Sequence, residues 1–151
     1  MSSSHEALIR LFDELGGSLE QLAALAREKI DAVKKDDLLA LDEVIKQEQA
    51  YALKFRSMDN KRSRLLKELG LERVPLHELA AHFPPELQLQ VKKSAESLRD
   101  RFRIYQSAAE VSRHTLECNL HEIEKLIESA GRDPGLLGGD PPAPMKTDFR
   151  I

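Results

Sequence analysis

Three side chains near the end of this 151-residue chain have the spacing of metal ligands. His114, Cys118 and His121 recur at four and then three residues, so on a helix they share one face. Imidazole and thiolate there could chelate Zn²⁺, with a water or a partner's ligand completing the tetrahedron. The next residue on that face is Lys125, a cation that would repel the metal. The face also lies roughly 200° around the helix from its apolar stripe, so it should face solvent. We therefore expect no physiological metal site, and any bound metal would be adventitious.

The other polar residues form no recognisable catalytic arrangement. No glycine-rich loop joins a strand to a helix, and the carboxylates follow surface-helix spacing. Five histidines and a single cysteine suggest no catalytic triad. The sequence therefore predicts a protein that is not an enzyme and binds no cofactor.

Charge and composition narrow the class of partner and the compartment. With 23 basic and 26 acidic residues the net charge is −3, which argues against binding nucleic acid. One cysteine excludes an internal disulfide and suits a reducing compartment. Residues Met1–Arg10 do not resemble a signal peptide, and no apolar run approaches the ~20 residues of a membrane span. We expect a cytoplasmic protein without membrane insertion.

Three segments that carry apolar residues in an alternating three-four rhythm must form the scaffold. Residues 18–69 and 86–130 contain neither glycine nor proline, so nothing interrupts a helix there. Such a rhythm keeps a stripe on one helix face, which must then pack against a partner. The stripe of the first segment comprises Leu8, Leu11, Phe12, Leu15, Leu19, Leu22, Ala26, Ile30 and Val33. That of the second comprises Leu41, Val44, Glu48, Tyr51, Phe55, Met58, Arg62, Leu65 and Leu69. That of the third comprises Leu87, Val91, Ser94, Leu98, Phe102, Tyr105, Ala109, Ser112, Leu116, Asn119, Ile123, Leu126 and Ala130.

Turn residues mark where these helices end. Gly16 and Gly17 lower the helix propensity of the first segment, but the apolar phase continues across them, which favours one helix with a weak point. Lys34–Asp37 predicts a tight turn whose aspartates can cap the second helix. Gly70 predicts that helix's end. A short helix is expected around Leu76 to Phe83, before the proline-led final helix that ends at Gly131.

The predicted fold is therefore all-α, an elongated antiparallel bundle of three long helices and one short helix. Residues 1–130 would form this bundle, with Phe55 and Met58 in its core. Residues 131–151 hold four of the seven glycines and four of the seven prolines, which predicts an extended, mobile tail.

Two features of the stripes leave alternatives open. Glu48 and Arg62 interrupt the second stripe, either to meet polar groups of a neighbouring helix or to extend from the seam into water. Ala109, Ser112 and Asn119 make the middle of the third stripe small and polar. This indicates either close helix packing or a groove for a guest helix.

The order of several short motifs resembles the FlgN-type flagellar export chaperones. These motifs are Asp37-Leu38-Leu39-Ala40-Leu41, then Glu48-Gln49, and then Asn60 to Leu71 with its Arg-x-x-Leu-Leu and Leu-Gly-Leu. Two positions depart from the family pattern. Ala109 and Ser112 stand where the family often has two asparagines, and Leu137-Gly138 replaces an aromatic-glycine step.

This resemblance implies a cytoplasmic chaperone for the hook–filament junction proteins, which it would deliver to the flagellar type III export gate. The last helix would cover the amphipathic C-terminal helix of the substrate. Its expected substrate-binding residues are Leu98, Phe102, Tyr105, Ala109, Ser112, Leu116 and Ile123. The tail would dock on the export gate through Leu136, Leu137 and Phe149. A chaperone of this kind should be a monomer or weak homodimer, whereas the alternative, a structural coiled-coil adaptor without an export role, would form a tight homodimer.

Overall fold

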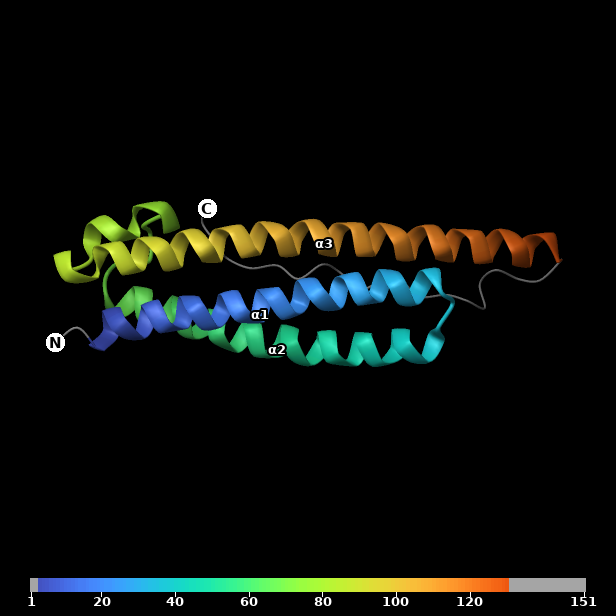
Figure 1. Cartoon of the computed structure of the whole chain (residues 1–151), viewed down its shortest axis with the longest axis horizontal. Helices are drawn as coiled ribbons and strands as arrows, with labels where there is room; N and C mark the ends of the chain where they lie inside the picture. Colours follow the sequence, from blue (N-terminus) through green and yellow to red (C-terminus); the bar gives the residue numbers. More distant parts are fainter. Residues whose placement is uncertain (1–2, 131–151) are drawn as a thin grey trace.

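Three long helices dominate the computed structural model, which describes residues 3–130. They are α1 (Ser3–Lys34), α2 (Leu38–Glu68) and α3 (Gln88–Ser129), and no strand occurs within this range. Two 3-10 helices, η1 (Leu76–His82) and η2 (Pro85–Leu87), connect α2 to α3. Consecutive long helices run in opposite directions, so α1 and α3 point the same way (Figure 1). The expected all-α bundle is confirmed, with the short helix in 3-10 form. The predicted tail, residues 131–151, lies outside the described residues.

The ends of α2 follow from its capping residues. The Asp37 carboxylate accepts a hydrogen bond of 3.0 Å from the Ala40 N–H, which satisfies one of the free donors at the start of the helix. At the other end Gly70 adopts a φ of 70°, and the Leu71 N–H donates to the Leu66 carbonyl at 2.8 Å. This is the glycine-terminated cap that the sequence predicts, with Leu71 buried against the core.

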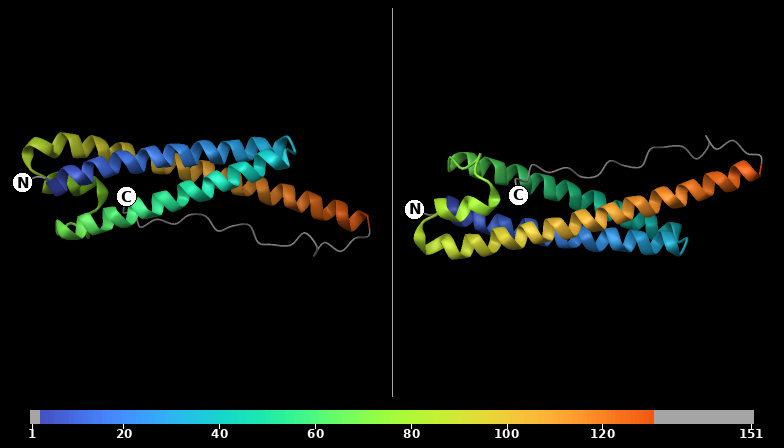
Figure 2. Two further views of the ribbon diagram at one scale, coloured as in Figure 1. Left: turned by 90° about the horizontal axis from the view of Figure 1, so that it is seen from below. Right: turned by 90° about the horizontal axis from the view of Figure 1, so that it is seen from above.

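Helix α1 is continuous through its two glycines and forms the centre of the bundle. Both α2 and α3 pack along it, whereas α2 and α3 approach each other closely at very few points (Figure 2). The side chain of Arg101 from α3 lies across Gly16, where an added Cβ would come within 2.5 Å of an Arg101 Nη atom. Gly16 therefore permits the close approach of that side chain.

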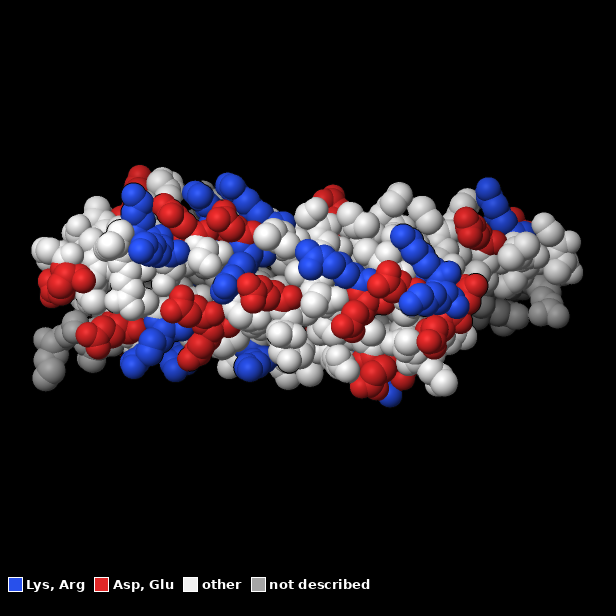
Figure 3. Space-filling model, in the orientation of Figure 1, with Lys and Arg blue, Asp and Glu red and all other residues white. Residues whose placement is uncertain are grey.

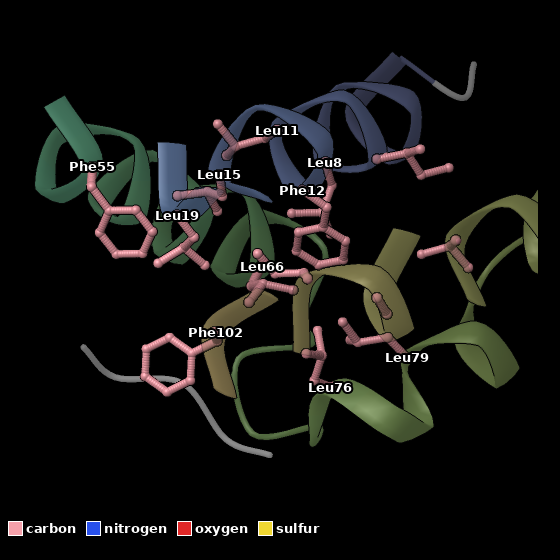
Figure 4. Close-up of a cluster of buried hydrophobic side chains, with 14 of the residues drawn as sticks. Leu8, Leu11, Phe12, Leu15, Leu19, Phe55, Leu66, Leu76, Leu79 and Phe102 are labelled. Carbon is pink, nitrogen blue, oxygen red and sulfur yellow. The ribbon is translucent and has the colours of Figure 1, made fainter. Parts of the chain in front are cut away.

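One apolar core runs along α1 and is closed at one end by η1. In Figure 4 the leucines and Phe12 of α1 face Phe55 and Leu66 of α2, Phe102 of α3, and Leu76 and Leu79 of η1. Phe55 is fully buried and Met58 half-buried beside it, as expected from the second stripe. The largest fully buried side chains are Phe12, Phe55, Leu8, Ile9, Leu15, Leu19, Leu22, Leu79, Leu98 and Val91.

Candidate functional site: the exposed end of the last helix

The apolar stripe of α3 changes character along the helix. Its first half is buried: Leu98 is 1% exposed, Phe102 7% and Tyr105 8%. Ser112 is the last buried residue of α3, although the helix continues to Ser129. We call residues 113–129 the distal section of α3. It projects beyond the turn between α1 and α2 (Figures 1 and 2).

The distal section keeps an apolar face that no described element covers completely. Leu116, Leu120, Ile123 and Ile127 follow one another at spacings of four, three and four residues, so they share one face. Ile123 is 38% exposed, and Leu126 at the edge of this face is 70% exposed. An isolated helical end is marginally stable in water and gains most from packing its apolar face. The geometry therefore suits this end for receiving another helix.

The structure divides the predicted substrate-binding residues into two groups. Leu98, Phe102, Tyr105 and Ser112 lie in the core of the bundle. Ala109 and Leu116 are half-buried and Ile123 is exposed. A partner can reach the second group directly, whereas the first would become accessible only if α3 separated from α1.

Polar contacts hold the three long helices together beside this stripe. The Ser94 hydroxyl of α3 donates to the Asp13 carboxylate of α1 at 3.0 Å. The Lys29 ammonium of α1 donates to the Glu48 carboxylate of α2 at 2.7 Å. Burial, and to a lesser degree the negative charge of Glu48, raise the pKa of Tyr105 on α3 above its usual value.

The two interruptions of the second stripe have different partners. Glu48 meets a neighbouring helix through Lys29, as one of the two alternatives predicted. Buried Arg62 donates from Nε to the Asp59 carboxylate at 2.7 Å, one turn earlier on α2.

The three metal-ligand candidates lie on an exposed face of the distal section. His114, Cys118 and His121 are all exposed. The Cys118 Sγ lies 3.6 Å from the His114 Nε2. No group of three or more His, Cys, Asp or Glu side chains within residues 3–130 is arranged to hold a metal ion. The predicted gate-docking residues Leu136, Leu137 and Phe149 lie outside the described residues.

One surface feature was not predicted as a site. Arg62, Arg64 and Lys67 of α2 and Arg73 of the following loop line a pocket of about 400 Å³. The first three belong to the most basic stretch of the sequence, so their clustering was visible. That Arg73 joins them depends on the path of the loop after Gly70, which local sequence patterns do not define.

The fold and the exposed helical end define an elongated all-α protein suited to binding other helices. Residues 1–134 match the family described as FlgN protein, and the chain belongs to that family. The family is one of chaperones, so membership supports a general role as a flagellar export chaperone. No match was found among the curated proteins or the solved structures. Within the described residues no helix is both long and apolar enough to cross a membrane.

Proposed function

We propose that this protein is a cytoplasmic chaperone that binds the amphipathic C-terminal helix of hook–filament junction proteins. It keeps them unassembled and delivers them to the flagellar type III export gate. The observation that carries this proposal is the distal section of α3, an apolar helix face that continues past the end of its own bundle. Family membership supplies the general export role, and this face supplies a surface for the substrate.

The substrate helix would add to the distal section as a helix packed lengthwise along it. Leu116 and Ile123 would provide the first contacts, and Ala109 would allow a close approach. Phe102 and Tyr105 would extend the site inward if binding moved α3 away from α1. Otherwise they act indirectly, since they anchor to the bundle the helix that carries the site.

Release at the export gate requires that binding be of modest strength. A substrate terminus that folds on binding loses conformational entropy, which offsets part of the contact energy. The accessible apolar face is also short, which limits the area that can be buried. Both features favour reversible binding.

Isothermal titration of the full chain with a peptide covering the C-terminal helix of a junction protein tests the proposal. The double variant Leu116→Ala/Ile123→Ala should weaken binding by roughly one to two orders of magnitude, because each buried side chain contributes ~1.5–3 kcal/mol. Leu53→Ala, at a position of α2 that is 69% exposed, is the matched control and should bind normally. Equal affinity of both variants would exclude the distal section as the substrate site.

The same face would serve the alternative function, a coiled-coil adaptor that self-associates. That role predicts a tight homodimer in analytical ultracentrifugation without any guest, which Ile123→Glu would dissociate. A monomer or weak dimer that gains helicity when the peptide is added supports the chaperone.

A further inference from the structure

A second surface lies at the opposite end of the bundle from the distal section of α3. The C-terminal turns of α2, the loop after it and η1 enclose the pocket of about 400 Å³ noted above, which we call the basic pocket. The C-terminus of α2 and the far end of α3 lie at opposite ends of the molecule (Figure 1). The basic pocket and the proposed substrate surface are therefore separate.

The floor of the basic pocket is apolar and rigid. Leu66, Leu76 and Leu79 contribute to it, and they are 6%, 8% and 1% exposed because they also belong to the main core. Figure 4 shows these three side chains converging from α2 and η1. Val74, half-buried, completes the apolar part. An apolar side chain placed on this floor would extend an existing core.

The rim of the basic pocket is positively charged. Arg64, Lys67 and Arg73 are exposed and form no ion pair with any of residues 3–130. Arg62 forms an inner wall and is held by Asp59, while Glu72 is the one acidic residue among those that line the pocket. Three such cations around one pocket stand out in a chain whose net charge is −3.

We propose that the basic pocket binds a short segment of a partner protein in which a carboxylate neighbours a large apolar side chain. The guanidinium groups of Arg64 and Arg73 can each donate two parallel hydrogen bonds to a carboxylate. The apolar floor receives the neighbouring side chain, and the volume lies within the usual range of binding pockets, roughly 300–1,000 Å³.

Two simpler explanations account for less. A cation in the last turn of α2 stabilises the negative end of the helix dipole, which explains Lys67 but not Arg73, located beyond the helix. Single-stranded nucleic acid would need aromatic side chains for base stacking, and none lines the pocket. On the face shown in Figure 3, acidic and basic side chains also alternate along the bundle, so no continuous basic track is present there.

The test uses the full-length, ¹⁵N-labelled chain and three blocked peptides of equal length, which alternate Asp with Leu, Asn with Leu, and Asp with Ser. The Asp–Leu peptide should shift the NMR signals of the Ser63, Leu66 and Val74 amides. The other two peptides should bind at least about tenfold more weakly, since each lacks one half of the recognition. Higher salt should weaken the Asp–Leu peptide because the rim charges are exposed.

Charge-reversal variants locate the interaction. Arg64→Glu/Arg73→Glu should abolish the shifts, whereas Lys54→Glu/Arg56→Glu, the same change in net charge at exposed positions of α2, should retain them. If the reversal unfolds the chain by circular dichroism, Arg64→Gln/Arg73→Gln replaces it and should weaken binding about tenfold. Equal binding of the Asp–Leu and Asn–Leu peptides, shifts elsewhere on the protein, or displacement of the peptide by a short RNA would each overturn the proposal. The outcome is independent of whether the distal section binds a substrate helix.

Discussion

The Lys29 ammonium of α1 lies 2.7 Å from the Glu48 carboxylate of α2, and the two side chains are only 10% and 24% exposed. Tyr105 of α3 is close enough for the Glu48 charge to contribute to its raised pKa. The pair therefore joins two helices beside the third. Because α1 is the only long helix on which both others pack extensively, this contact helps to align the bundle.

Removing one member of this pair should destabilise the protein more than replacing both. Glu48→Ala leaves the Lys29 ammonium buried without its partner, which should cost about 1–3 kcal/mol of unfolding free energy. The double variant Lys29→Met/Glu48→Met should lose less, because an apolar pair of similar size needs no charge compensation. Urea unfolding of the two single variants and the double variant forms a double-mutant cycle. Strict additivity would show that the pair contributes no coupling energy.

Phe55 should be among the most sensitive positions for stability. Its side chain is 1% exposed, and Phe55→Ala should cost ~3–5 kcal/mol through lost burial and the cavity left behind. Leu53→Ala on the exposed face of the same helix should change stability by less than about 0.5 kcal/mol. Denaturant unfolding measures both. A loss below about 1 kcal/mol at Phe55 would mean that the core around it collapses to fill the space.

The two adjacent glycines of α1 should respond differently to alanine. An added Cβ at Gly17 meets nothing within 4 Å, so Gly17→Ala should stabilise the protein by roughly 0.5–1 kcal/mol through higher helix propensity. At Gly16 the methyl group would displace Arg101, whose Nε lies 3.0 Å from the Glu20 carboxylate. Gly16→Ala should therefore gain less. Thermal unfolding compares the two, and a destabilising Gly17→Ala would show that α1 needs flexibility there.

Ionisation of Tyr105 should destabilise the fold at high pH. Its folded-state pKa is raised by burial and by Glu48, so the neutral phenol is the form that the fold favours. The stabilisation is complete below the ordinary tyrosine pKa of about 10 and is lost as the pH rises through the higher folded value. Absorbance titration should show one late-titrating tyrosine that disappears in Tyr105→Phe. In Tyr51→Phe, which removes the only other tyrosine, it should remain.

Local patterns were sufficient to predict the helices but not which surfaces they cover. The aspartate cap at Asp37 and the glycine cap at Gly70 depend on adjacent residues, and both boundaries are confirmed. That α1 is the shared partner of α2 and α3 depends on tertiary packing, because a stripe shows that a face is buried and not what buries it.

The same limit explains the placement of Phe102 and Tyr105. Both lie on one unbroken stripe with Leu116 and Ile123, and periodicity cannot separate a core section from an exposed one. Helix length held the missing signal. The last helix has 42 residues against 32 and 31 for the others, so about 10 residues, roughly 15 Å, must lack a helical neighbour of equal length.

Deleting the segment Asp133–Ile151 should separate substrate binding from delivery. The described core and the distal section of α3 are formed by residues before this segment, so the truncated chain should keep its helical content and its affinity for the junction-protein peptide. Export should fall, because the proposal assigns gate docking to Leu136, Leu137 and Phe149. Isothermal titration and circular dichroism test the first expectation, and an export assay in flagellated cells tests the second. The full-length variant Leu136→Ser/Leu137→Ser/Phe149→Ser is the matched control, since it removes the apolar side chains without shortening the chain. If truncation abolishes peptide binding while helical content is unchanged, the segment belongs to the substrate site and the proposed division between α3 and the tail is wrong.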